Sequence, residues 1–173
     1  MKLKKWIAVL LVFLLLLTGA FFYFLKRSNS FDRTKYIAKV NGEGILKSDY
    51  EKELAKSRHF FLWAKQDLKN IPSLENDVLN KMIDLALINQ YTKKKGIEIS
   101  DEEVNNYFVQ YLAGKNQTEE EYLQKIKEMY GSSKEDVLKT IANDLLKEKV
   151  QSAAGKPLKE WLAEKRASSK TIR

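Results

Sequence analysis

The sequence predicts a mainly α-helical protein, in which an N-terminal transmembrane helix precedes a module of five to six helices with a small β-hairpin and a terminal strand. Three observations predict this class. A long apolar segment without charged residues lies near the N-terminus. Helix start and stop signals recur along the rest of the chain. Between these signals, apolar residues recur at the three- and four-residue spacing of amphipathic helices.

The N-terminal segment has the length and composition of a membrane-spanning helix. Trp6 to Leu25 form an uncharged run of 20 residues, which as a helix covers about 30 Å, the thickness of the hydrocarbon core of a bilayer. We therefore expect residues 1–25 to comprise a short cytoplasmic flank and a transmembrane signal anchor, which contacts lipid through residues 6–25. The polar residues 26–35 resemble a short tether.

A cleaved signal peptide is the alternative interpretation of this segment. Thr18-Gly19-Ala20 has the small residues of a cleavage site, so the chain would be cut after Ala20. Five apolar residues, 21–25, would then begin the mature protein, which favours the uncleaved anchor. Basic residues flank both ends of the apolar run, so charge alone does not orient it.

The soluble part is predicted to begin with a β-hairpin. Tyr36–Val40 is rich in β-prone residues and is followed by Asn41-Gly42, a dipeptide typical of a two-residue hairpin turn. Glu43–Leu46 would form the returning strand. Ser48 lies three residues before Glu51, which is the spacing of a capping box, so the first helix is expected to start there.

Five helices follow, bounded by serine or threonine caps and by glycine or proline stops. They are expected at residues 49–69, 74–95, 100–114, 118–131 and 133–154. The second is apolar around most of its circumference, so we expect it to be the central helix that the others cover. A sixth, short segment after Pro157 has Trp161 and Leu162 as an apolar face. Residues 170–172 would then form a strand that returns to the hairpin.

The residues that usually carry chemistry are absent or have a structural explanation. The sequence contains no cysteine and one histidine, His59, so neither a thiolate site nor a zinc site is expected. His59 lies within a predicted helix without a nucleophile motif, which is typical of a surface or packing residue. Carboxylates cluster at 101–103 and 119–121, in first turns of helices, where they compensate the positive helix end. We expect no catalytic residue, no metal and no cofactor.

The net charge of +8 does not by itself predict nucleic-acid binding. Lys2, Lys4 and Lys5 precede the apolar segment, and the remaining charges alternate in sign along the chain instead of forming a basic stripe. No nucleic-acid partner is therefore expected. The sequence does not indicate an oligomeric state.

Surplus aromatic side chains on two helices are the candidate binding residues. Residues 60–63 are four consecutive large apolar residues and cover all sides of a helix, although one helical face is already apolar without Phe60 and Trp63. Two interpretations remain open. A neighbouring helix buries the extra rings, or some of them line an exposed apolar groove, since large exposed apolar patches mark binding sites. The candidates are Phe60, Phe61, Trp63, Tyr107, Phe108 and Tyr111.

Three stretches in a fixed order carry a resemblance to a known family. They are Val40–Ile45 with Ser48 and Tyr50, then Met82-Ile83-Asp84 continuing through Leu87-Ile88, Gln90 and Lys93–Ile97 to Ser100–Val104, and finally Trp161–Arg166. Together they resemble the N-terminal chaperone module of the SurA and PrsA foldases, which is related to the C-terminal chaperone domain of trigger factor. The resemblance covers residues 36–173.

The resemblance implies an extracytoplasmic holdase that binds unfolded, apolar-rich segments of exported proteins and is attached to the cell membrane by a single span. Similar proteins usually carry a parvulin-type prolyl isomerase domain between the helical module and its closing segment. Here the junction at 153–156 contains no insertion. A parvulin site also resembles a pocket with paired histidines, so prolyl isomerase activity is not expected.

A second function from a different class remains open. The helical module could instead be a non-catalytic interaction subunit that docks one dedicated, folded membrane or envelope partner. Selective binding of that partner, without binding of assorted unfolded peptides, would distinguish it from a chaperone.

Overall fold

The computed structural model describes residues 31–173, and residues Thr34–Arg173 form one compact unit. The predicted anchor at 6–25, the alternative cleavage site after Ala20 and the first half of the predicted tether lie outside the described residues. In the part of the chain that the structure describes, no helix is both long and apolar enough to cross a membrane.

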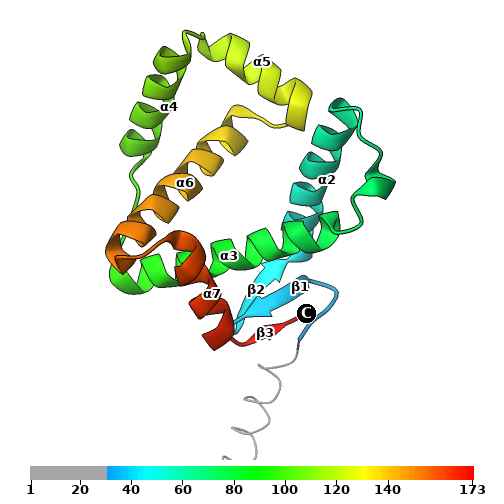
Figure 1. Ribbon diagram of the computed structural model, residues 1–173, viewed down its shortest axis with the longest axis vertical. Coiled ribbons are helices and arrows are strands. Elements are labelled where there is room, and N and C mark those ends of the chain that lie inside the picture. Colours follow the sequence, from blue (N-terminus) through cyan, green and yellow to red (C-terminus); the bar gives the residue numbers. More distant parts are fainter. Residues whose placement is uncertain (1–30) are drawn as a thin grey trace, which may run out of the picture. The chain divides into compact units, whose positions relative to one another are not determined.

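The described residues are mainly helical, with six α-helices, one short 3-10 helix and a three-stranded sheet (Figure 1). The elements are, in order, β1 (Tyr36–Val40), β2 (Glu43–Leu46), α2 (Lys47–Trp63), η1 (Leu68–Asn70), α3 (Leu74–Lys95), α4 (Asp101–Lys115), α5 (Glu119–Tyr130), α6 (Lys134–Ala154), α7 (Leu158–Ser168) and β3 (Thr171–Ile172). This confirms the prediction of a mainly helical module with a hairpin and a terminal strand.

The small sheet joins the two ends of the unit. Its strand order is β2-β1-β3, and both pairings are antiparallel. In the hairpin turn, Asn41 and Gly42 have φ values of 52° and 91°, the left-handed conformation that such a turn requires. The backbone N–H of Asn41 donates to the carbonyl oxygen of Lys170 at 2.9 Å, and the Lys170 N–H donates to Asn41 Oδ1 at 3.0 Å. The terminal strand therefore returns to the hairpin as predicted.

Helix α2 begins without the predicted capping box. Strand β2 runs directly into the helix, so that Leu46 occupies the N-cap and no side chain caps it. The N–H of Lys47 donates to the carbonyl oxygen of Lys35 at 2.9 Å. Because the chain just before β1 satisfies this donor, the helix starts before Ser48, and the prediction of a Ser48–Glu51 box is wrong.

Helix α2 also ends earlier than predicted, at Trp63 instead of near residue 69. Lys65 adopts a left-handed φ of 56°, which terminates the helix. The chain then forms η1, in which the Asp67 side chain accepts a hydrogen bond from the Lys69 N–H at 3.0 Å. Leu68 of η1 packs against the buried cluster of Leu54, Leu74 and Val78.

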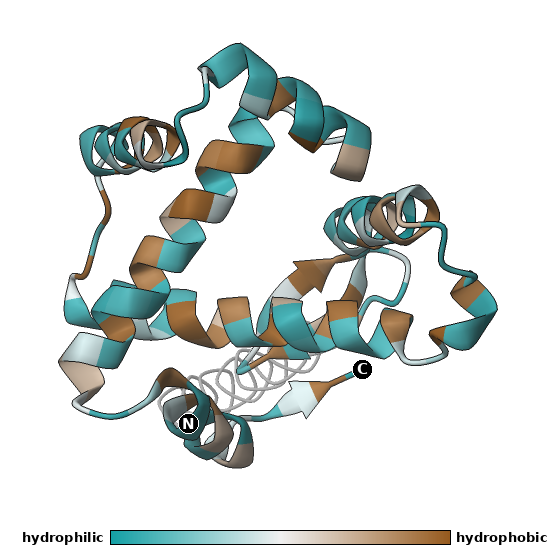
Figure 2. Cartoon of the chain, turned by 45° about the horizontal axis from the view of Figure 1, so that its top comes forward, coloured by the Kyte–Doolittle hydropathy of each residue, from teal (hydrophilic) through white to brown (hydrophobic). Residues whose placement is uncertain are grey.

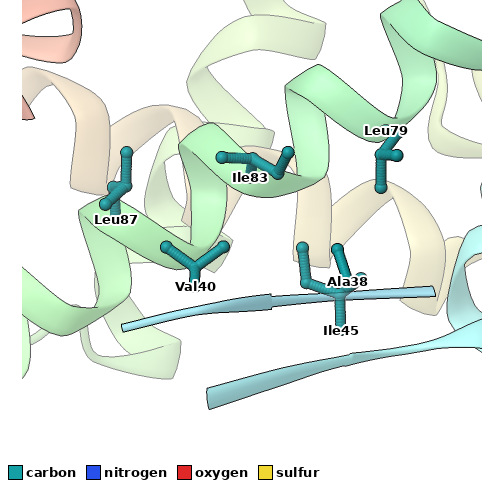
Figure 3. Close-up of a cluster of buried hydrophobic side chains, with 6 residues drawn as sticks. All are labelled: Ala38, Val40, Ile45, Leu79, Ile83 and Leu87. Atoms are coloured by element: carbon teal, nitrogen blue, oxygen red, sulfur yellow. The ribbon is translucent and has the colours of Figure 1, made fainter. Parts of the chain in front are cut away.

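Helix α3 is the central helix, as predicted, since three of the four buried clusters of the described residues contain its side chains. The first cluster packs α3 on one face of the sheet (Figure 3) and consists of Ala38, Val40, Ile45, Leu79, Ile83 and Leu87. The second joins α3 to α2 at Leu54. The third joins α3 to α6 and α7 through Ile88, Val150 and Trp161. Helix α3 therefore holds the sheet, α2, α6 and α7 together through buried apolar contacts.

The starts of α4, α5 and α6 are set by local capping. Ser100 with Glu103 and Thr118 with Glu121 form the predicted boxes, in which each side chain accepts from the other residue's backbone N–H. Ser133 caps α6 in the same way. These caps fix where the three helices begin, independently of what they pack against.

Candidate functional site

An apolar cleft lies among helices α2, α4, α5 and α6 and has a volume of about 540 Å³. We refer to it as the aromatic cleft. Its apolar wall consists of Phe60, Phe61, Tyr107, Tyr111, Tyr122, Ile126, Tyr130, Val137 and Ile141. The helices that bound it carry both apolar and hydrophilic residues along their length (Figure 2). The cleft is therefore a concave surface rich in rings, of the kind that binds apolar ligands.

The structure brings four of the six predicted binding residues together at this cleft. Phe60 and Phe61 of α2 and Tyr107 and Tyr111 of α4 all line it, although the two pairs are more than forty positions apart in the sequence. Tyr107 is 41% exposed and Tyr111 is 38% exposed. Part of the aromatic surplus is thus accessible at the cleft wall.

The other two predicted residues lie elsewhere. Phe108 is 2% exposed and packs with Leu112 and Val137 in the core between α4 and α6. Since consecutive residues on a helix point about 100° apart, Phe108 faces the neighbouring helix, whereas Tyr107 is partly exposed at the cleft. Trp63 is 48% exposed, but it is not among the residues that line the cleft.

Helix α5 contributes wall residues that the sequence did not single out for binding. Tyr122, Ile126 and Tyr130 form one stripe at helical spacing. Such a stripe is the usual signature of a core face, so periodicity alone gave no reason to place it at a cleft. Within the described residues no side chain of α5 is fully buried. Tyr122 and Ile126 pack against the core between α4 and α6, and they also line the cleft.

Ring contacts hold the walls together. Phe60 stacks on Tyr130 with ring centroids 4.9 Å apart and planes at 6°, which joins α2 to the end of α5. Tyr111 meets Tyr122 edge to face at 5.5 Å, which joins α4 to α5. Aromatic pairs of this geometry stabilise contacts beyond the burial of their area. The two interpretations left open by the sequence therefore both apply, because the rings pack on each other and still line a cleft.

His59 supports the same closure of α5 against α2. Its Nε2 lies 2.8 Å from the carbonyl oxygen of Glu128 near the end of α5. A carbonyl oxygen can only accept, so Nε2–H is the donor in this hydrogen bond. The position of His59 agrees with the packing role that the sequence predicted for it.

An ionic cluster joins α2 to the start of α6 at the polar side of the cleft. The Asp136 carboxylate lies 2.8 Å from Lys56 Nζ and 2.9 Å from Lys52 Nζ, and it accepts from the Ser133 N–H at 3.1 Å. The hydrogen bond from Lys56, then that from Lys52 and the one from the Ser133 backbone, lower the pKa of Asp136 well below its ordinary value, against an opposing effect of burial. The sequence predicted a serine cap at the start of this helix, but it did not single out Asp136 or its lysine partners on α2.

A second cleft of about 380 Å³ adjoins the aromatic cleft on the side of β2. We refer to it as the polar cleft. It lies among β2, α2, α3 and α6, and the residues it shares with the aromatic cleft are Glu53, Lys56, Lys81, Asp136, Thr140 and Asp144. The Lys56–Asp136 ion pair thus stands at the boundary between an apolar compartment and a charged one.

The two clefts differ in the contacts that they offer to a ligand. Among residues 31–173, no group of three or more histidine, aspartate or glutamate side chains could hold a metal ion. The carboxylates that line the aromatic cleft all form ion pairs with lysines. The polar cleft contains one further carboxylate, Asp49, for which the described residues give no ion pair. What the site offers a ligand is a set of rings on several helices with a charged margin.

The chain is similar to one protein family and to two chaperones. The family model described as the SurA-like N-terminal domain matches residues 1–151. Chaperone SurA of Buchnera aphidicola subsp. Schizaphis graminum (strain Sg) is 35% identical over 109 residues, which cover 63% of this chain and 25% of that protein. Periplasmic chaperone PpiD of the same organism is 33% identical over 121 residues, which cover 56% of this chain and 20% of that protein. The chain therefore spans about a quarter or less of the length of these relatives.

Proposed function

Since the chain belongs to the family of SurA-like N-terminal domains, we propose that it is a membrane-anchored extracytoplasmic holdase, which binds unfolded apolar-rich segments of exported proteins in the aromatic cleft. The single observation that carries this proposal is the convergence of rings from α2, α4 and α5 on one cleft. Both relatives named above are chaperones, and one is named as periplasmic, which supports the location outside the cytoplasm.

The chemistry of the cleft suits clients of varied sequence. Burial of one large apolar side chain contributes about 1.5–3 kcal/mol, so a few rings hold a segment without a fixed pattern of hydrogen bonds. Phe60, Tyr111 and Tyr130 come from three different helices, and small shifts of these helices would adapt the wall to different side chains. Such a site favours apolar content over a particular sequence.

In the proposed division of the chain, the N-terminal segment holds the cleft close to the membrane. Residues 1–25 are the flank and anchor, 26–35 the tether, and 36–173 the helical module. Anchoring would raise the concentration of the cleft near the membrane, where exported chains emerge, and a short tether keeps this effective concentration high.

We expect the chain to suppress the aggregation of an unfolded client, and the double change Tyr107→Ser with Tyr111→Ser to weaken client binding about tenfold or more. Both rings line the cleft and are partly exposed, so their loss removes binding surface. The structural cost of the change is the loss of the Tyr111–Tyr122 ring contact. The measurement is light scattering of reduced, unfolded α-lactalbumin with the full chain in lipid nanodiscs, together with the anisotropy of a labelled apolar peptide.

Val109→Ser is the matched control for this experiment. Val109 lies on the same helix and is 63% exposed, but it does not line the aromatic cleft. The control should bind the peptide as the unchanged chain does. Equal losses in the control and in the double variant would remove the basis for placing clients in the cleft. Binding of one folded partner with no binding of unfolded peptides would instead favour a dedicated interaction subunit.

We also expect the chain to leave proline isomerisation at its uncatalysed rate, which takes tens of seconds. In the described residues α6 and α7 are joined by Gly155, Lys156 and Pro157 alone, and this short junction supports the expectation. A protease-coupled assay on a proline peptide measures the rate. An acceleration at catalytic amounts of the chain would show that an isomerase site exists.

A further inference from the structure

One lysine borders both clefts without an ionic partner. Lys81 of α3 lines the aromatic cleft and the polar cleft. Among the ionised side chains that line the aromatic cleft, the others are paired, and the pairs are Lys56 with Glu53 at 3.0 Å, Lys56 with Asp136 at 2.8 Å and Asp144 with Lys147 at 2.7 Å. Within residues 31–173, the side chain of Lys81 makes no hydrogen bond, ion pair or ring contact. Its ammonium group is therefore the one available charge at the margin of the rings in the described structure.

The polar cleft adds a second available cation. Lys139 of α6 lines it and is likewise without a partner among the described residues. Asp49 is the corresponding acid, but it lies in the first turn of α2, where the free N–H groups of the helix end compensate its negative charge. The charge left over for a ligand in this compartment is therefore positive.

We infer that the chain prefers client segments in which apolar or aromatic residues are flanked by aspartate or glutamate, with the apolar residues in the aromatic cleft and a flanking carboxylate at Lys81. This inference rests on the proposed function and names the class of client. The two clefts adjoin, so an extended segment that places its rings in one continues past Lys81 toward Lys139 in the other. Lys81 is then a specificity-determining residue, and the rings supply the binding itself.

The preference follows from what each flank would meet. An acidic flank gains an exposed charge–charge contact with Lys81, which is modest and screened by salt. An amide flank of the same shape leaves Lys81 solvated and loses only this contact. A basic flank meets a like charge at the entrance to the polar cleft. Peptides with acidic flanks should therefore bind most tightly, those with amide flanks less tightly and those with basic flanks least tightly. The differences in affinity should decrease as the ionic strength rises.

Three peptides test this inference with the full chain in lipid nanodiscs. They share one central segment of Phe, Trp and Leu and differ only in flanks of Asp, Asn or Lys. We expect the Asp peptide to bind about threefold tighter than the Asn peptide at low salt. Lys81→Gln should make these two affinities equal, Lys81→Arg should restore the preference, and Lys81→Glu should reverse it. Lys159→Glu is the control, because Lys159 lies on α7, outside both clefts and without a side-chain partner among residues 31–173.

The outcomes separate this inference from the proposed function. Equal affinity of the unchanged chain for the Asp and Asn peptides, or a preference that survives in Lys81→Gln, overturns the role of Lys81 while leaving the aromatic cleft as the binding site. A preference that Lys159→Glu abolishes equally would assign it to net charge and would overturn the inference in the same way. Failure of every peptide to bind overturns both proposals. Loss of the acid preference in Lys81→Gln, with the affinity for the Asn peptide unchanged, supports both.

Discussion

Trp161→Ala is expected to lower the free energy of unfolding by about 3–5 kcal/mol, the usual cost of removing a large buried ring. Trp161 is 3% exposed and packs with Ile88 and Val150, and its ring meets Tyr91 edge to face at 5.1 Å. It is one of the contacts through which α7 packs against α3 and α6. Its loss leaves a cavity where three helices meet, and helices packed this closely refill such a space only in part.

Trp63→Ala is the matched control for this effect, since it removes the same side chain from an exposed position. Trp63 is 48% exposed, with its ring centroid 6.2 Å from that of Phe60, so we expect a loss below about 1 kcal/mol. Urea unfolding followed by far-ultraviolet circular dichroism measures both variants. Similar losses for Trp63→Ala and Trp161→Ala would contradict the assignment of α7 to the core.

Asp136→Asn is expected to destabilise the chain by about 1.5–3 kcal/mol, the range for hydrogen bonds to charged groups. The change removes the ionic contacts with Lys52 and Lys56 and weakens the cap of α6 at Ser133. Lys56 would be left with Glu53 as its ionic partner. Because these contacts join α6 to α2, peptide binding in the aromatic cleft should weaken as well.

The same carboxylate gives the stability a dependence on pH. The pKa of Asp136 is lowered in the folded chain, so its contribution is complete above the pKa of an unfolded aspartate, about 3.9, and is lost as the pH falls below that value toward the folded pKa. Urea unfolding at a series of pH values from about 7 down to about 2 follows this loss. The curve for Asp136→Asn should approach that of the unchanged chain at the acid end. A constant gap between the two curves would show that the charge of Asp136 contributes nothing.

Elements defined by local signals could be predicted from the sequence. The capping residues of α4 and α5, the Asn41-Gly42 turn and the all-round apolar character of α3 each involve residues a few positions apart, and all three lie where they were expected. The start of α2 was wrong because its N-terminal donor is satisfied by the carbonyl of Lys35, twelve residues away. A capping motif spans only a few consecutive residues, so it cannot include a partner that lies twelve positions away.

The aromatic character of the candidate site could be predicted from the sequence, but the full set of residues that line it could not. The sequence showed too many rings for one helical face at 60–63 and a second group at 107–111. It did not show that α5 would close against α2, which places Tyr130 on Phe60 and turns a core-like stripe into a cleft wall. Nor did it show the contacts of Asp136 with two lysines some eighty residues away.

The sequence by itself therefore determined the order of the helices, the caps of α4 and α5 and the presence of an aromatic surplus, because these depend on spacing within one element. Only the tertiary structure decided which rings face a partner helix and which face the cleft, as the neighbours Tyr107 and Phe108 illustrate. Helical geometry fixes the angle between two adjacent side chains. Whether a given direction points to solvent or to another helix depends on contacts between distant parts of the chain, which no local pattern contains.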